Sequence, residues 1–189
     1  MKKKALFALV VVLLLCAGAL NVSAQLRLDM SVSFPLYLGA YASGYESSGF
    51  NSYFIPFPEI QLAYQFGEGA LHGGVGARTF TFIIENILYP AAFIEYAIDP
   101  IVLSLNVGGF AFLEFGLLSS VLEQNHIATL SGFHSVILPD FNVAYKVNDW
   151  FRLSAGMFIF APFGSELGGY LSGFAFAGYL QARFIVVFD

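Results

Sequence analysis

Two short segments of this chain contain the residue types that enzymes use for nucleophilic catalysis. One segment contains Ser119, Ser120, Glu123 and His126, and the other contains His134 beside Ser135. A serine, a histidine and an acid cooperate only where their side chains meet. His134 and Ser135 are neighbours in a segment that alternates like a strand, so their side chains point to opposite faces. We interpret the first segment as a solvated loop, and the sequence therefore predicts no enzyme.

Metal and cofactor chemistry has equally little support. The three histidines, at positions 72, 126 and 134, are scattered, and the single cysteine, Cys16, lies near the N-terminus. Structural zinc sites need several cysteine or histidine ligands at characteristic spacings. We therefore expect no metal site and no cofactor.

Charged residues show a clearer pattern, because they alternate with apolar ones. In residues 26–38 every second residue is apolar, from Leu26 to Leu38, and Arg27 and Asp29 lie between them. This period of two is that of a strand with one apolar and one polar face. The same alternation in later segments adds seven charged residues, so nine lie on polar faces: Arg27, Asp29, Glu59, Arg78, Glu95, Asp140, Lys146, Arg152 and Arg183. Mixed charges on facing surfaces are expected to pair as a polar plug.

Eight strands are needed to position these residues. We predict them at residues 26–38, 54–66, 71–83, 87–97, 101–113, 132–147, 151–161 and 172–188. The connections after the second, fourth and sixth strands are tight, with turn residues such as Asp99-Pro100 and Asn148-Asp149. Those after the first, fifth and seventh are long. Short turns on one side and long loops on the other are typical of outer-membrane barrels.

The first 24 residues have the composition of a cleavable signal peptide. Lys2, Lys3 and Lys4 precede an apolar stretch, and Val22-Ser23-Ala24 is a small-residue cleavage site. We predict cleavage after Ala24, which leaves residues 25–189 as one domain and removes the cysteine. The remaining five basic and thirteen acidic residues give a net charge of −8, so no nucleic-acid partner is expected.

The apolar faces need a hydrophobic environment. Mean hydropathy is +0.73 and only 11% of residues are charged, yet no second long apolar run follows the leader. In hydrocarbon only helices and closed barrels satisfy the backbone. The sequence therefore predicts an all-β fold, a transmembrane up-and-down antiparallel barrel of eight strands whose apolar faces contact outer-membrane lipid. A secreted sandwich or small soluble barrel is the alternative.

The chain resembles the small eight-stranded bacterial outer-membrane barrels of the OmpX, OmpA-barrel and OmpW types. The resemblance covers residues 26–188 and rests on the architecture, the leader and the last strand. That strand ends Leu180-x-Ala182-x-Phe184-x-Val186-x-Phe188, like the C-terminal sorting signal of such barrels, although here Asp189 follows the aromatic. The resemblance implies a location in the bacterial outer membrane, but it does not assign the chain to one subfamily.

The inward residues are graded along the barrel axis. Toward the long loops they are apolar, which gives these candidate ligand-binding residues: Phe57, Phe80, Phe82, Tyr89, Phe93, Phe110, Phe112, Leu138, Phe158 and Phe160. A cavity with apolar lining is the usual form of a small-molecule site. Two alternatives stay open: a bulge at Gly108-Gly109 or near Gly156 turns the following phenylalanines outward, or the aromatics fill the lumen as a core.

Two classes of function follow. The resemblance to OmpW-type barrels implies that small hydrophobic molecules enter from outside and leave sideways, because the polar floor is blocked. The alternative is a structural or adhesin-like barrel with a plugged lumen and no transport. Its extracellular partner would contact the connections at residues 39–53, 115–130 and 162–171.

Overall fold

The computed structural model describes residues 24–42, 45–50, 55–67, 69–82, 85–109, 111–116, 128–131, 136–162 and 173–188. Within them lie eleven strands: β1 (Ala24–Ala42), β2 (Tyr45–Phe50), β3 (Phe57–Phe66), β4 (Leu71–Phe82), β5 (Glu85–Ile98), β6 (Ile101–Gly109), β7 (Phe112–Gly116), β8 (Ala128–Ser131), β9 (Val136–Lys146), β10 (Phe151–Pro162) and β11 (Gly173–Phe188). The predicted signal peptide falls almost wholly outside these residues and stays a prediction.

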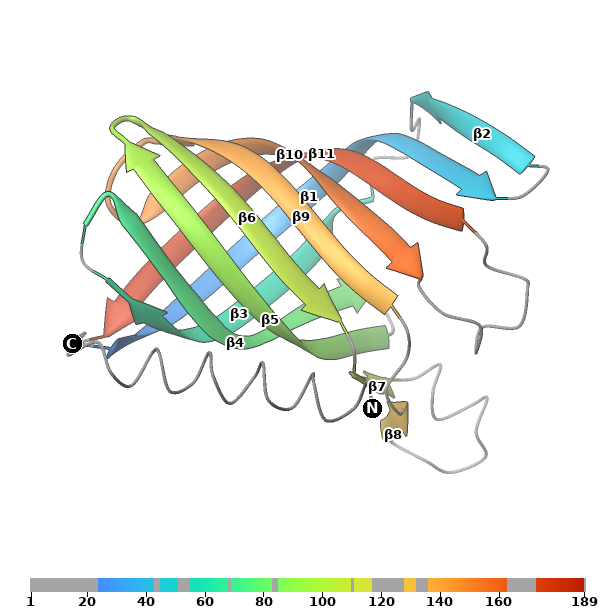
Figure 1. Cartoon of the computed structure of the whole chain (residues 1–189), viewed down its shortest axis with the longest axis horizontal. Helices are drawn as coiled ribbons and strands as arrows, with labels where there is room; N and C mark the ends of the chain where they lie inside the picture. The colour runs from blue at the N-terminus through green and yellow to red at the C-terminus, as the bar shows by residue number, and fades with distance from the viewer. Residues whose placement is uncertain are drawn as a thin grey trace, which may run out of the picture.

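Eight of these strands close into an antiparallel barrel (Figure 1). Around the barrel the order is β1, β3, β4, β5, β6, β9, β10 and β11. The first and last strands pair along their length, from Leu26 opposite Phe188 to Ala42 opposite Gly173. Each barrel strand therefore neighbours the next one in the sequence, which is the up-and-down topology. The predicted fold class is confirmed.

One end of the barrel has tight turns and the other has extended connections. We call them the turn end and the loop end. At the loop end β2 pairs with the last residues of β1, β7 pairs with the start of β5, and β8 pairs with β7. These three short strands extend beyond the barrel (Figure 1). The predicted loops 39–53 and 115–130 are thus partly strand, because their backbone groups pair with neighbours rather than with water.

Strand boundaries differ from prediction mainly at the loop end. The first strand continues to Ala42. The predicted start of the sixth barrel strand, at residues 132–135, lies outside the described residues. The fifth is interrupted after Gly109, whose φ of +117° is a conformation that side-chain-bearing residues rarely adopt. The chain then resumes as β7, which continues the pairing with β5 nearer the loop end.

A bulge changes the faces of β1. The register with β11 shifts between Pro35 and Tyr37, so β1 has one extra residue there. Proline has no N–H to donate, and bulges are common where pairing is interrupted. Beyond this point Leu38 faces a cavity inside the barrel, while Tyr37 stacks on Phe176. The prediction that Leu38 lies on the outer apolar face is wrong, because the alternation shifts by one residue.

The outer surface of the barrel is apolar. Large side chains such as Ile60, Ile94, Val143, Leu153 and Leu180 are each about half exposed. Along the described parts of the eight barrel strands, no arginine, lysine, aspartate or glutamate points outward. An outward-facing arginine at the bilayer midplane would cost about 2–4 kcal/mol. This segregation gives the barrel a surface suited to lipid.

Candidate binding cavity and the charged network beneath it

The lumen toward the turn end is crossed by a network centred on Glu95 of β5, which is 1% exposed. Arg27 of β1 donates from Nη1 to Oε2 at 2.9 Å and from Nη2 to Oε1 at 3.0 Å. Arg152 of β10 donates to Oε2 at 2.9 Å, and Ser104 of β6 donates to Oε1 at 3.3 Å. His72 Nε2 of β4 lies 2.9 Å from Oε2. One carboxylate thus joins five strands.

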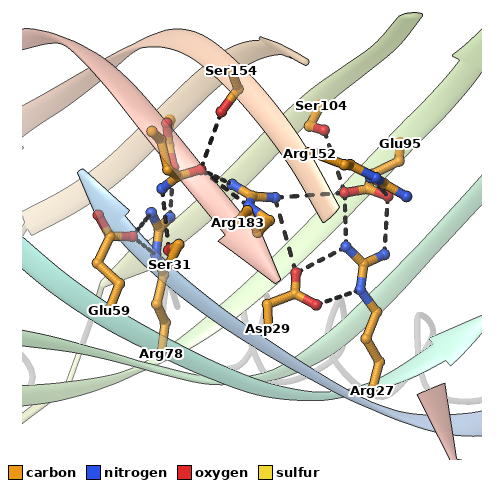
Figure 2. A network of polar contacts seen from close by, with 12 residues as sticks. Arg27, Asp29, Ser31, Glu59, Arg78, Glu95, Ser104, Arg152, Ser154 and Arg183 are labelled. Carbon is orange, nitrogen blue, oxygen red and sulfur yellow. Dashed lines mark hydrogen bonds and ion pairs between the residues drawn. The ribbon is translucent and has the colours of Figure 1, made fainter. Parts of the chain in front are cut away.

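The remaining members of this network lie on β1 and β11 (Figure 2). Arg27 also holds Asp29 with two bonds of 2.7 and 2.8 Å, which is the bidentate geometry of strong guanidinium–carboxylate pairs. Arg183 Nη1 lies 3.6 Å from Glu95 and 3.9 Å from Asp29. We call Arg27, Asp29, Glu95, Arg152 and Arg183 the Glu95 network. Its three arginines and two carboxylates have a formal charge of +1.

A second charged group lies beside the first and nearer the loop end. Arg78 of β4 donates to Glu59 of β3 from Nε at 3.1 Å and to Asp140 of β9 from Nη1 at 2.6 Å. Ser33 donates to the other oxygen of Glu59 at 2.6 Å, and the Tyr179 hydroxyl donates to Asp140. We call Arg78, Glu59 and Asp140 the Arg78 group. One arginine between two carboxylates gives it a formal charge of −1.

Gln181 of β11 connects the two groups. Its amide donates to Ser31 at 3.2 Å and to Ser33 at 2.9 Å, and its carbonyl accepts from Arg183 Nη2 at 2.8 Å. Ser33 is already bonded to Glu59, so hydrogen bonds run continuously between the groups. An eight-stranded barrel has an interior that side chains can fill. In this layer they do so, and the layer forms a polar floor.

Two predicted placements differ from the structure. Lys146, expected in the plug, lies at the end of β9 with its side chain 33% exposed, and its ammonium is 2.7 Å from Asp149 in the adjoining turn. Phe93, expected in the apolar half, lies under Arg27, with the guanidinium carbon 4.7 Å from the ring centroid. The tilt and stagger of the strands place Phe93 opposite Gly74, at the level of the Glu95 network.

Above the floor, toward the loop end, lies a cavity of about 520 Å³. This volume is within the range of roughly 300–1,000 Å³ of small-molecule sites. Its walls include seven predicted residues: Phe57, Phe80, Tyr89, Phe112, Leu138, Phe158 and Phe160. Glu59, Arg78 and Tyr179 contribute to its floor. The cavity thus combines an apolar wall with one polar end.

Aromatic rings in the lumen lie flat against the barrel wall at glycines. A Cβ added to Gly108 would lie 2.4 Å from the Tyr89 ring, and one added to Gly156 would lie 2.6 Å from the Tyr179 hydroxyl. These positions tolerate no side chain without displacing the aromatic. The glycines thus let large rings form part of the wall instead of filling the lumen.

The structure shows for some of the predicted phenylalanines whether they point outward or into the lumen. Phe158 and Phe160 line the cavity, so no bulge near Gly156 turns them outward. Phe80 packs edge-on against Phe158 with ring centroids 5.1 Å apart, and Phe112 also lines the cavity. Phe110 and the side chain of Phe82 lie outside the described residues. The Ser119–His126 segment, His134, Ser135 and most of loop 162–171 lie outside them as well.

Several residues that line the cavity were not among the predicted ligand-binding residues. Ser33, Pro35, Ile87 and Ala177 face the lumen by simple alternation, and this pattern alone could have identified them. Leu38 could not be found in this way, because the bulge reverses its side. The only available signal was Pro35 itself, a residue that disfavours regular pairing in a strand.

A second hollow of about 380 Å³ adjoins the first. It shares Leu38, Phe158, Phe160 and Ala177 with the main cavity and continues to Gly39, Ala40, Ser47, Ala175 and Phe176. These residues belong to β1, β2, β10 and β11 near the loop end. The hollow therefore lies on the loop-end side of the β1 bulge.

The described residues contain no cluster of three or more histidine, cysteine, aspartate or glutamate side chains arranged to hold a metal ion. They also contain no helix of sufficient length and apolar character to span a membrane.

Comparison with known proteins reveals structural neighbours only. No family model and no curated protein matches the chain. Solved structures with similarity include Neisserial surface protein A, at 13% identity and a TM-score of 0.47, covering 84% of this chain and 96% of that one. The N-terminal β-barrel domain of Pseudomonas aeruginosa OprF matches at 10% identity and a TM-score of 0.44, covering 87% and 100%. The attachment invasion locus protein of Yersinia pestis, Ail, matches at 8% identity and 0.37, covering 86% and 99%.

These similarities concern the fold. The closure of the barrel, its apolar outer surface and its charged interior are properties of the chain's own strands. On that basis the chain is a small eight-stranded β-barrel of the outer-membrane type.

Proposed function

We propose that this outer-membrane barrel binds small apolar molecules in the cavity at its loop end. The observation that supports the proposal is the 520 Å³ cavity, which is walled by aromatic and aliphatic side chains and bounded below by charged pairs. Apolar pockets with a few polar groups are the usual form of ligand sites. A lumen filled by side chains throughout would instead have favoured a purely structural barrel.

The route through the barrel is part of the proposal. The Glu95 network and the Arg78 group obstruct the direct path to the turn end, because opening it would separate buried ion pairs. A molecule that enters from the loop end would then leave sideways. The adjoining hollow beside β1, β10 and β11 supports this direction, since it includes Gly39 and Phe176, which lie on the opposite face of their strands from Leu38 and Ala177.

A titration with N-phenyl-1-naphthylamine, an apolar fluorescent probe, tests the binding step. The purified barrel in lipid nanodiscs is expected to bind the probe saturably, beyond the signal of empty nanodiscs. Phe158→Arg places a charge in the cavity and should weaken binding at least about tenfold, because an unpaired charge in an apolar site is costly. Gly49→Arg is the matched control, since a side chain at Gly49 of β2 meets nothing within 4 Å.

The result can contradict the proposal in two ways. Either the unmodified barrel shows no saturable binding, or Phe158→Arg binds as tightly as the unmodified barrel while it is folded. The heat-dependent gel shift of folded barrels checks the second condition. Probe transfer into vesicles, measured separately, tests passage.

Surface interaction is the second candidate function. Phe50 of β2 is 86% exposed and lies on the part of the chain that extends beyond the barrel. Its ring packs edge-on against the Tyr37 ring, with the ring centroids 5.3 Å apart. Aromatic side chains, phenylalanine among them, are enriched at protein–protein interfaces relative to the rest of the surface. This candidate corresponds to the adhesin-like alternative. It predicts that β2 still binds a surface partner when Phe158→Arg weakens probe binding.

A further inference from the structure

The wall of the cavity is built largely from aromatic rings. Five phenylalanines from four strands line its described part: Phe57 of β3, Phe80 of β4, Phe112 of β7, and Phe158 and Phe160 of β10. All of them except Phe112 are only partly buried, although they point into the lumen, so their rings border the open space itself. An apolar ligand in this cavity would therefore touch ring surfaces on several sides.

The rings of the wall differ in orientation. Phe80 and Phe158 pack edge-to-face, with their ring planes 77° apart and their centroids 5.1 Å apart. The Phe80 and Tyr89 rings are closer to parallel, with an angle of 27° between their planes. A planar molecule that lies parallel to Phe80 is therefore close to perpendicular to Phe158. Offset-stacked and edge-to-face arrangements are both favourable between aromatic rings, so one orientation of a planar ligand satisfies both.

The floor of the cavity is balanced in charge. The Glu95 network and the Arg78 group have opposite formal charges and are joined by hydrogen bonds through Ser33 and Gln181, so the two charges offset each other. The Arg78 guanidinium carbon also lies over the Phe80 ring, 5.2 Å from its centroid, so one face of that ring is turned to the floor. A ligand in the cavity meets the other face of Phe80 or its edge. Selectivity is therefore expected to come from the wall.

We propose that the cavity prefers small planar aromatic molecules to aliphatic molecules with the same carbon skeleton. This inference rests on the proposed function, and it assigns the selectivity to the orientation of the wall rings. Apolar area stabilises either kind of ligand, because the hydrophobic effect is non-directional. Each well-oriented pair of aromatic rings adds a further factor of about 2 to 12 in affinity, which an aliphatic ligand does not gain.

Naphthalene and decalin, which share one carbon skeleton, test this preference. Each is used to displace N-phenyl-1-naphthylamine from the barrel in lipid nanodiscs, and free concentrations are corrected for partition into empty nanodiscs of the same lipid. Two favourable ring contacts should make naphthalene bind about tenfold more tightly than decalin. Decalin has the larger apolar surface, so a cavity that selected by apolar area alone would bind decalin at least as tightly.

Leucine substitutions identify the rings responsible. Phe158→Leu keeps an apolar side chain but removes one ring of the edge-to-face pair, so the preference for naphthalene should fall by a factor of about three or more. Phe80→Leu removes the other ring of the pair and should act in the same direction. Phe141→Leu makes the same change at an exposed position on the outer face of β9, and as the control it should leave the preference unchanged.

The outcomes separate the two proposals. If N-phenyl-1-naphthylamine does not bind saturably, the proposed function fails. If it binds and decalin displaces it as well as naphthalene does, the inference on selectivity is wrong while the binding function stands. The inference is equally wrong if Phe158→Leu and Phe80→Leu both keep the full preference for naphthalene. Heat-dependent gel shifts of each variant establish that the barrels compared are folded.

Discussion

The two halves of the lumen use the same strands and the same alternation, but they are filled differently. Toward the turn end, long charged side chains reach across the barrel and bond to partners on distant strands, as Arg27 does with Glu95. Toward the loop end, rings such as Tyr89 lie against the wall at glycines and leave about 520 Å³ open. The shape of the side chains and the ion pairs that they form therefore determine which half of this lumen is filled and which half is open.

The two halves of the lumen also differ in charge, because both charged groups belong to the floor. The Glu95 network has a formal charge of +1 and the Arg78 group −1, so they balance as a pair while each is unbalanced alone. Buried ion pairs usually add little net stability, but the removal of one partner is costly. The free energy of unfolding should therefore be sensitive to single substitutions in the floor, and less sensitive to substitutions of the side chains that line the cavity.

The largest effect is expected from Glu95→Ala. This change leaves Arg27 and Arg152 without the carboxylate they share, and an uncompensated buried charge costs about 3–5 kcal/mol. The free energy of unfolding can be measured by urea titration of the barrel in lipid vesicles. Trp150, the single tryptophan, reports folding because it lies exposed on the outer surface and stacks on Phe184 at 5.8 Å.

Glu46→Ala is the matched control for this experiment. Glu46 is exposed on β2, outside the barrel, so its loss should leave the unfolding free energy within about 0.5 kcal/mol. Equal stability of Glu95→Ala and the unmodified barrel would mean that the Glu95 network does not hold the floor together.

A pair of alanine substitutions compares packing in the two halves. Ala144 of β9 is 3% exposed, and Ala177 of β11 lines the cavity. Ala144→Leu should destabilise the barrel by about 1–3 kcal/mol, because a filled interior cannot accommodate added methylenes. Ala177→Leu should change stability little and weaken binding of N-phenyl-1-naphthylamine about tenfold, because it occupies cavity volume. Equal destabilisation by both would show that the loop-end half is packed as tightly as the turn-end half.

Much of this architecture could be predicted from the sequence. A barrel with one lipid-facing surface fixes the direction of every side chain once a strand's parity is known, so Arg27, Glu95 and Arg183 could be placed inside. The identity of their partners could not be predicted. Which charge meets which depends on strand stagger, and Arg27 and Glu95, 68 residues apart, lie on strands that are not adjacent in the barrel.

The candidate site was harder to predict, for two physical reasons. Leu38 was misplaced because a single extra residue in β1 reverses the alternation, and periodicity does not reveal a bulge. Phe93 was assigned to the apolar half because its height along the barrel depends on tilt, which the sequence does not give.

The smallest effect is expected at an ion pair outside the floor. Lys146 lies 2.7 Å from Asp149, which is 94% exposed, and this hydrogen bond lowers the pKa of the Asp149 carboxyl from its ordinary 3.8. A lowered folded-state pKa stabilises the fold above about 3.8, and this stabilisation disappears as the pH falls through the lower value. Solvent and salt screen the pair, so Lys146→Gln should return the Asp149 pKa toward 3.8 in an NMR titration without measurably changing stability at neutral pH. If Lys146→Gln instead destabilised the barrel as much as Glu95→Ala, Lys146 would belong to the floor, and the contrast between buried and exposed charges at the turn end would be wrong.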